Sequence, residues 1–258
     1  MSATETTDPR PDVAVSVAEV MTVVLARNLL DKETAMQGFA SPLPTAAIRL
    51  AREQAPDLHH LSASGALDGT PSTIPVSTED QRLLEGATAH FTSPEAFDLS
   101  AKGKVDVLFI GSPQIDRQGR LNGTAIGDWD DPTVKFGGGG GSGSLLPLVD
   151  DVYAWRTEHT ERSFPEDVDF VTAAGNLTCV VTPLCVFEKR AGELQVVSLH
   201  PGVDRETVQE HTGWDVTVAE TGTTDPPTET ELELLEAVDP TRTRRSGFRS
   251  DQLDPLPE

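Results

Sequence analysis

A run of five glycines at positions 137–141, continued by Ser142, Gly143 and Ser144, is the part of this chain best suited to bind an anion. A residue without a Cβ adopts positive φ freely and lets its backbone approach a ligand closely. Successive N–H groups of such a loop can surround a phosphate, a carboxylate or the oxyanion of a reacting thioester. A flexible surface linker explains the same composition, so the residues around the loop must decide between the two interpretations.

Two amide side chains upstream of the loop, Gln114 and Asn122, are candidates for lining a ligand pocket. They lie in a segment that also carries Asp116 and Gly119. An Asp followed three residues later by Gly is typical of a β-turn, and we interpret residues 116–119 in that way. For Gln114 and Asn122, local turn chemistry remains an alternative to pocket lining.

The order of these residues closely resembles the β subunits of family I coenzyme A transferases. The nearest type is the B subunit of glutaconate CoA-transferase, and the 3-oxoacid CoA-transferases are further away. The resemblance covers roughly residues 13–240 and continues after the loop into residues 162–175. Its specific block consists of Gly111, Gln114, Asp116, Gly119, Leu121, Asn122, Gly127, Asp128 and Phe136, followed by the glycines.

This resemblance implies a fold, a partner and a ligand. The family's β subunits are open α/β sheets covered by helices, work with a separately encoded α subunit, and form the active site at the interface between the two. Their substrates are an acyl-CoA thioester and a carboxylic acid. By match to the family's glycine loop, Gly140 and Gly141 are expected to contact the thioester or its oxyanion, with Gly138 and Ser142 beside them.

One expected residue is missing. The resemblance implies a glutamate nucleophile before a Ser-Gly or Asn-Gly pair at the end of an early strand, and in the matching segment Ala63 stands in its place. Ser62 and Ser64 are the polar side chains left there. A serine nucleophile needs a histidine base, and the neighbours His59 and His60 would point to opposite faces of a strand. Serines at a strand end more often satisfy backbone groups.

Three functions therefore compete. The first is transfer of coenzyme A between carboxylic acids, which the block around the glycine loop favours. The second is hydrolytic opening of a ring in a CoA-linked substrate by a carboxylate of the α subunit. Ala63 favours this alternative, as does a resemblance of residues 198–203 to a group of actinobacterial steroid-degradation proteins. The third is a non-catalytic subunit that only binds CoA and positions its partner.

Composition and charge bear on the partners and the cellular location of the protein. The 258 residues carry a net charge of −22, which disfavours binding to nucleic acid or to an anionic membrane because no basic face can displace counterions. Few lysines among so many Asp and Glu indicate adaptation to a high-salt cytoplasm, where salt screens carboxylate repulsion. There is no apolar run of transmembrane length, no secretory signal and no metal-ligand spacing, and two cysteines are too few for a disulfide framework. A cytosolic protein is expected.

The pattern of elements predicts an α/β fold with an open, mostly parallel sheet covered by helices and a strand-rich C-terminal part. We expect a disordered leader over residues 1–12, a single domain over 13–240 and a polar tail over 241–258. Helices are predicted at 13–30, 46–54 with Thr45 as cap, 78–89, from Ser93 onward, 205–212 and 228–237; strands at 58–63, 105–110, 169–172, 177–185 and 194–199; and a strand or helix at 145–155.

Three smaller expectations concern the two cysteines, one histidine and a basic cluster. Cys179 and Cys185 are predicted to be core residues of a strand. His200 precedes Pro201 and Gly202, and we interpret it as a structural residue of a turn rather than a catalyst. The basic cluster of Arg242, Arg244, Arg245 and Arg249 is interpreted most simply as a solvated tail, with contact to the acidic body or to the partner subunit as the alternative.

Overall fold

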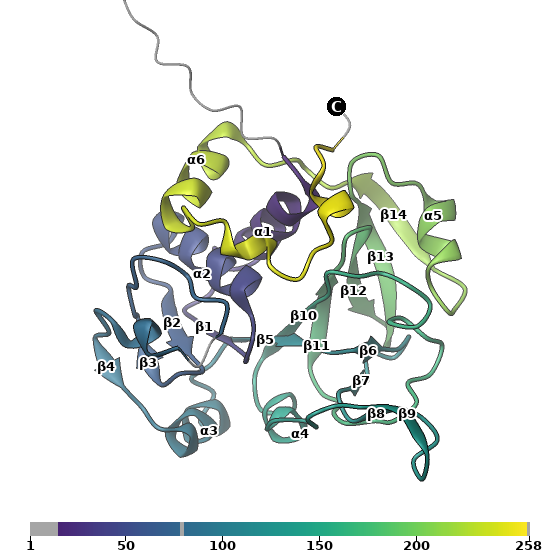
Figure 1. Cartoon of the computed structure of the whole chain (residues 1–258), viewed down its shortest axis with the longest axis horizontal. Helices are drawn as coiled ribbons and strands as arrows, with labels where there is room; N and C mark the ends of the chain where they lie inside the picture. Colours follow the sequence, from purple (N-terminus) through teal and green to yellow (C-terminus); the bar gives the residue numbers. More distant parts are fainter. Residues whose placement is uncertain (1–14, 78–79, 257–258) are drawn as a thin grey trace, which may run out of the picture.

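The computed structural model describes residues 15–77 and 80–256. A mixed ten-stranded sheet runs through the described chain in the order β14-β13-β12-β11-β10-β5-β1-β2-β3-β4 (Figure 1). The bounds of its strands are β1 (Thr34–Gln37), β2 (His59–Ser62), β3 (Ala66–Leu67), β4 (Ala89–His90), β5 (Val107–Gly111), β10 (Asp151–Trp155), β11 (Leu177–Val181), β12 (Cys185–Arg190), β13 (Glu193–Leu199) and β14 (Val218–Thr223).

The central part of this sheet is parallel. Strands β2, β1, β5, β10 and β11 all run in one direction. Strands β12 and β13 add an antiparallel meander on one side, and β3 and β4 add short antiparallel strands on the other. The predicted α/β class with a mostly parallel sheet and a strand-rich C-terminal part is therefore confirmed.

Alternate residues of the central strands enter two separate cores. Val107 and Phe109 of β5 pack with the helices on one face, whereas Leu108 packs on the other. This is the period of two that a strand buried on both faces must have. The β-branched and aromatic residues at 105–110, interrupted by Asp106, predict a strand there, and the structure confirms it as β5.

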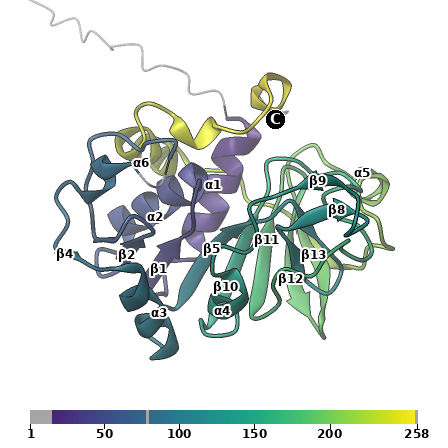
Figure 2. The ribbon, with the colours of Figure 1, turned by 60° about the horizontal axis from the view of Figure 1, so that its bottom comes forward.

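Three helices cover the first face: α1 (Val17–Arg27), α2 (Pro42–Gln54) and α6 (Glu229–Val238) (Figures 1 and 2). α1 is buried almost all round, because the sheet lies on one side of it and the C-terminal segment crosses the other. A capping box between Ser16 and Glu19 begins this helix. The hydrogen bond from Leu256 N to the Val15 carbonyl, 2.9 Å, fastens the chain end beside it.

The opposite face carries smaller elements that surround the glycine loop. They are α3 (Ser93–Ala101), the pair β6 (Gln114–Ile115) and β7 (Leu121–Asn122), the pair β8 (Ala125–Gly127) and β9 (Pro132–Lys135), α4 (Ser142–Leu145) and α5 (Arg205–Glu210). α3 and α4 lie side by side below the end of β5 in both views (Figures 1 and 2). The glycine loop is the connection from β9 to α4.

Several predicted elements need correction. The helix expected at 78–89 is wrong: residues 78–79 lie outside the described chain, and the rest of the segment forms the single 3₁₀ turn η1 (Gln81–Leu84) and then enters β4. Gly86, at φ +67°, comes after the turn, and β4 pairs with β3. α2 begins at Pro42 with Ser41 as its N-cap rather than with Thr45, since proline suits a first turn. The strand predicted at 169–172 does not form, and only the neighbouring Ala173 makes an isolated bridge, with Leu121.

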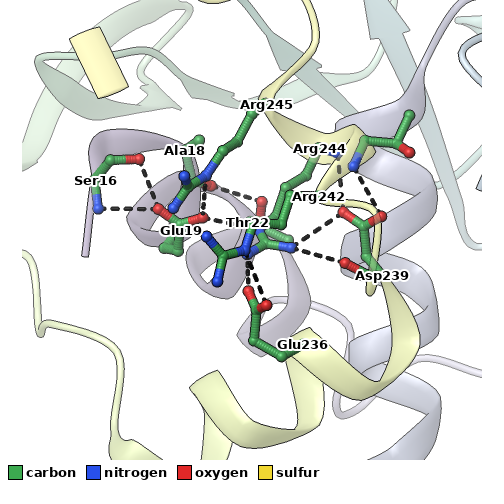
Figure 3. A network of polar contacts seen from close by, with 10 residues as sticks. Ser16, Ala18, Glu19, Thr22, Glu236, Asp239, Arg242, Arg244 and Arg245 are labelled. Carbon is green, nitrogen blue, oxygen red and sulfur yellow. Dashed lines mark hydrogen bonds and ion pairs between the residues drawn. The ribbon is translucent and has the colours of Figure 1, made fainter. Parts of the chain in front are cut away.

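The expectation of a solvated basic tail is wrong for Arg244. This guanidinium is fully buried and pairs with Glu19 at 2.8 Å, Asp239 at 3.2 Å and Glu236. Figure 3 shows the network between the start of α1, the end of α6 and the next turn of the chain, η2 (Thr243–Arg245). Burial opposes ionisation of Glu19, but hydrogen bonds from Arg245 and Ser16 and the charge of Arg244 hold its pKa below the ordinary value. The basic cluster thus contacts the acidic body, the alternative interpretation. The proposed leader, 1–12, lies outside the described residues.

Candidate functional site

A cavity of about 450 Å³ opens at the carboxyl ends of β1, β2 and β5. From β1, the chain proceeds to β2 on one side and then crosses to β5 on the other. Helix connections diverge at such a switch point, so ligands of open α/β sheets bind there. The wall consists of Met36, Gln37, Gly38, Phe39, Ala63, Ser64, Gly65, Phe91, Thr92, Ser93, Ala96, Phe97, Leu108, Phe109, Ile110, Gly111, Gly138, Gly139, Gly140, Ser142 and Leu145.

The glycine loop forms one wall of this cavity with its backbone. Gly138, Gly140 and Gly141 have φ of +89°, +55° and +99°, the left-handed region that favours glycine. Within the described chain, the N–H groups of Gly139, Gly140 and Gly141 have no hydrogen-bond partner. The loop is nevertheless anchored, because Gly138 N donates to the Gly123 carbonyl at 2.9 Å and Ser142 N to the Gly139 carbonyl at 2.8 Å. An anchored loop with unused donors is suited to an anionic ligand.

The five glycines serve two different purposes. A Cβ on Gly138 or Gly140 would meet no protein atom within 4 Å, so these positions face open space. A Cβ on Gly141 would lie 2.7 Å from Cζ of Phe97, so this glycine permits α4 to pack against α3. Gly138, Gly140 and Ser142 of the predicted loop residues line the cavity, and Gly141 lies behind it.

The missing glutamate maps to the tip of a hairpin. β2 and β3 pair through Ser62 and Ala66, which leaves Ala63, Ser64 and Gly65 as a three-residue turn. Gly65 is at φ +92°, and a Cβ there would lie 2.4 Å from the Phe91 carbonyl oxygen. Such a loop requires a left-handed third residue, usually glycine. Ala63 and Ser64 therefore face the cavity, and no described residue of its wall carries an ionisable side chain.

A chain of polar side chains runs behind this hairpin. Nε2 of His60 contacts Oε1 of Gln37, Nε2 of Gln37 donates to Oγ of Ser62 at 2.9 Å, and Oγ of Ser62 lies 2.7 Å from Oγ of Ser64. His60 is buried, whereas His59 is exposed and contacts Asp68 at 2.8 Å. The two histidines thus point to opposite faces, as the strand pattern predicts. Neither touches a serine, so the geometry supplies no base for a serine nucleophile.

Burial, and then the charge of Arg52, lower the pKa of His60 to about 3. The ring is therefore neutral at ordinary pH. Because the Gln37 oxygen can only accept, the tautomer that fits is the one with its proton on Nε2.

Gln114 and Asn122 lie outside the cavity wall. Both are buried, and Asn122 Nδ2 donates to Gln114 Oε1 at 2.6 Å while Gln114 Nε2 donates to Asp169 at 3.1 Å. Asp116 and Gly119 form the predicted turn: Gly119 N donates to the Asp116 carbonyl at 2.8 Å, and Gly119 has φ +74°. Gln114 lies on β6 and Asn122 on β7, and from these strands the chain continues through β8 and β9 into the glycine loop.

The remaining candidates are structural. His200 is buried and bonds through both ring nitrogens, to Thr224 Oγ1 at 2.9 Å and to the Thr182 carbonyl at 2.8 Å. Cys179 and Cys185 are buried free thiols on β11 and β12, as predicted, and burial raises the pKa of both. Among the described residues, no cluster of three or more His, Cys, Asp or Glu is arranged to hold a metal ion, and none of the helices there has the length and apolarity to cross a bilayer.

Sequence reasoning missed the residues at the end of β1 and those before and within α3. Gln37, Gly38 and Phe39 line the cavity from β1, while Phe91 lines it from just before α3 and Phe97 from α3 itself. The first group gives a weak signal in the sequence, because Gly38 is followed within six residues by Pro42 and Pro44, which is typical of a turn. The second group has no such signal, since Phe91 and Phe97 are ordinary apolar residues until α3 packs against the loop.

Fold and site together define an α/β protein with backbone N–H groups that are unpartnered within the described chain beside a cavity at the switch point of its sheet. The coenzyme A transferase family model matches residues 18–211, and the chain belongs to this family. It is 35% identical over 247 residues to the B subunit of 3-oxoadipate CoA-transferase from Pseudomonas knackmussii, covering 88% of this chain and 94% of that protein. The B subunit of glutaconate CoA-transferase from Acidaminococcus fermentans is 26% identical over 247 residues, with 86% and 92% covered.

Two further relatives have other activities in their names. The crystal structure of the decarboxylase AibA/AibB superposes with a TM-score of 0.85 at 32% identity, covering 91% of this chain and 99% of that chain. The cholesterol ring-cleaving hydrolase IpdB subunit of Rhodococcus jostii is 33% identical over 165 residues, which is 57% of this chain and 64% of that protein. The family is thus represented by subunits of more than one reaction class, and the chain is a subunit of the B type.

Proposed function

We propose that this chain is the β subunit of a heteromeric CoA-transferase that moves coenzyme A between carboxylic acids. The supporting observation is the anchored glycine loop, whose N–H groups at Gly139, Gly140 and Gly141 lack partners in the described chain beside a cavity at the switch point. The transferases among its relatives are also named as B subunits. The substrates proposed are an acyl-CoA thioester and a free acid, with no metal.

The loop would act on the oxygen that becomes negative during the reaction. A carboxylate that attacks the thioester carbonyl forms a mixed anhydride and expels the CoA thiolate. The thiolate then attacks the enzyme's carbonyl of the anhydride, which releases the first acid and leaves a thioester on the enzyme. A second acid reverses these two steps. Each attack places charge on a former carbonyl oxygen, and preorganised amide donors stabilise that charge.

The attacking carboxylate has to come from another polypeptide. Ala63 occupies the position expected for it, and the cavity wall contains no ionisable side chain among the described residues. An α subunit that closes the cavity would supply the carboxylate. This explains why a family member can lack the residue and still form half of an active site.

The proposed loop also suits the charge of the protein. A net charge of −22 repels an anionic ligand at long range. Neutral N–H donors act only at contact distance and need no basic patch. High salt would screen the long-range repulsion while leaving these contacts intact, and a cytosolic location at high salt remains part of the proposal.

Hydrolysis of a CoA-linked ring is the second candidate, and Ala63 is the observation that favours it. Without a nucleophile on the hairpin, a partner carboxylate could activate water rather than attack the thioester. The IpdB relative carries the name of a ring-cleaving hydrolase. In this case the glycine loop would still bind the thioester, but no enzyme-bound CoA would form.

The test uses the complex of this chain with its co-expressed α subunit. Acetyl-CoA or succinyl-CoA is the donor, 3-oxoadipate or glutaconate is the acceptor, and new acyl-CoA is followed by chromatography and mass spectrometry. Incubation with the donor alone, followed by borohydride or hydroxylamine, traps an enzyme thioester. A trapped glutamyl adduct on the α subunit together with acid-dependent CoA exchange supports transfer. In a parallel incubation with a CoA thioester of a cyclic ketone acid, ring opening without an adduct supports hydrolysis, and CoA binding without any turnover of either kind supports a non-catalytic subunit.

A further inference from the structure

We propose that the Ser64 hydroxyl donates a hydrogen bond to an oxygen of the ligand in the cavity, and that Ser62, Gln37 and His60 hold it in that orientation. The inference rests on the proposed function, because the ligand is the acyl-CoA thioester or the acid that accepts CoA. Ser64 is then a binding group and not a nucleophile. Gln37 and His60 act through it and are positioning residues.

The direction of donation follows from the atoms that meet. Oε1 of Gln37 can only accept, so Nε2 of His60 must donate to it. The amide of Gln37 is thereby fixed with its nitrogen toward Ser62, to which it donates at 2.9 Å. Ser62 Oγ accepts from Gln37 Nε2 and, at 3.4 Å, from Ser64 N, so both of its lone pairs are used and its proton is directed at Ser64 Oγ, 2.7 Å away. Ser64 in turn has one O–H left, and Ser64 lines the cavity.

The chain of donors is rigid. Gln37 and Ser62 face each other across the parallel pairing of β1 and β2, and both are buried. The hairpin tip is fixed by Gly65 N donating to the Ser62 carbonyl at 2.8 Å and by Phe91 N donating to the Gly65 carbonyl at 2.9 Å. His60 stays neutral at ordinary pH, so no change in its protonation reverses the direction of these hydrogen bonds. A donor held in one direction loses little entropy when a ligand binds.

Ser64 complements the glycine loop. Both line one cavity, and both present neutral donors in a wall without charge. An oxygen acceptor is the ligand atom that fits a lone O–H, so the chemical class is a carbonyl or carboxylate oxygen. A hydroxyl that instead satisfied only its own backbone would not need a buried histidine and glutamine behind it.

The experiment is a double-mutant cycle on the α–β complex, with acetyl-CoA as donor and 3-oxoadipate as acceptor. Ser64→Ala should lower kcat/KM by about 10- to 100-fold, the range for one hydrogen bond to a charged or developing oxyanion group. Ser64→Thr keeps the hydroxyl and should restore most of that loss. Gln37→Leu should cost about tenfold alone and nothing further in the Ser64→Ala background, since the two residues act as one unit.

Ser100→Ala is the matched control. Ser100 is buried on α3, bonds its own helix at the Ala96 carbonyl, and does not line the cavity, so its kcat/KM should stay within twofold. Equal penalties for Gln37→Leu in both backgrounds would overturn the inference, as would an unchanged Ser64→Ala enzyme. If the wild-type complex transfers no CoA, the proposed function fails. Calorimetric binding of acetyl-CoA to the same variants then tests Ser64 separately, and equal affinity for wild type and Ser64→Ala would reject it.

Discussion

Gly140→Ala separates ligand contact from folding, because the chain offers an almost identical control. Gly140 has φ +55° and its Cβ would meet no protein atom within 4 Å. Gly103, after α3, has φ +62° and equally open space. The two positions share the same backbone demand, and only Gly140 lines the cavity.

The expected cost in stability is the same for both variants. A left-handed residue other than glycine costs about 1–2 kcal/mol, and the loss of chain entropy in the unfolded state offsets part of it. For a chain of this size, 1 kcal/mol corresponds to about 2–4 °C in melting temperature. Both variants should therefore melt within about 8 °C of the wild type.

The expected cost in activity differs. A methyl group on Gly140 extends into open space beside the unpartnered amides and obstructs the approach of a thioester. Losing one oxyanion donor lowers kcat by about 10²–10³-fold, so Gly140→Ala should lose at least 100-fold and Gly103→Ala almost nothing. CoA exchange by the α–β complex, measured beside melting curves, tests this. Equal rates for the two variants would refute the assignment of the loop to the ligand.

Three further outcomes are expected. Arg244→Ala removes the fully buried cation that pairs with Glu19 and Asp239, while Glu19 keeps its contacts with Arg245 and Ser16. Urea denaturation should show a loss of about 3 kcal/mol, the lower end of the range for a broken buried pair, whereas Arg249→Ala, at an exposed pair, should show little. Equal effects would contradict the burial of the network. Melting temperature should rise from low salt to molar KCl because salt screens repulsion within a chain of net charge −22, and a flat response would exclude high-salt adaptation. Burial lowers the pKa of His60 and His159 to about 3 and that of His200 to about 4, so below about pH 6.5 these histidines take up protons in the unfolded chain but not in the folded one. The free energy of unfolding should therefore fall by about 4 kcal/mol as the pH drops from 6 to 5. A constant urea midpoint over that range would contradict the burial of three neutral histidines.

The sequence predicts the fold correctly where the residues of a segment determine its conformation without help from distant residues. The strand β5 and the turn from Asp116 to Gly119 are two such segments, and both predictions are confirmed. Residues 78–89 are not such a segment: their apolar spacing suits a helix, but pairing of β4 with β3 takes part of the segment and Gly86 lies at positive φ. Tertiary pairing overrides propensity in such short segments. Arg244 shows the same limit, since nothing near it in sequence indicates that Glu19, 225 residues away, will bury it.

The residues of the candidate site also differ in whether the sequence alone reveals them. A glycine run signals its own conformational freedom, so the loop is visible in the sequence. Gln37 is not, because its importance comes from lying opposite Ser62 across two strands that the chain separates by 25 residues. For Gln114 and Asn122 the sequence leaves pocket lining and local chemistry open, because amide side chains suit both. In the structure their amides bond one another and Asp169 in a buried core.

Because Ala63 carries no carboxylate, this subunit does not by itself determine the class of reaction. A glutamate at the hairpin tip would enter a cavity without a basic partner among the described residues, where burial raises the pKa of a carboxyl and lowers the fraction of it that is ionised. With Ala63 the wall is neutral and offers only donors, from the glycine loop and from Ser64. Such a surface binds a thioester oxygen equally well whether the next event is attack by a carboxylate or by water. Under the proposed function, the group that a partner places opposite these donors would set the reaction class, and this subunit would supply the oxygen-binding half of the site.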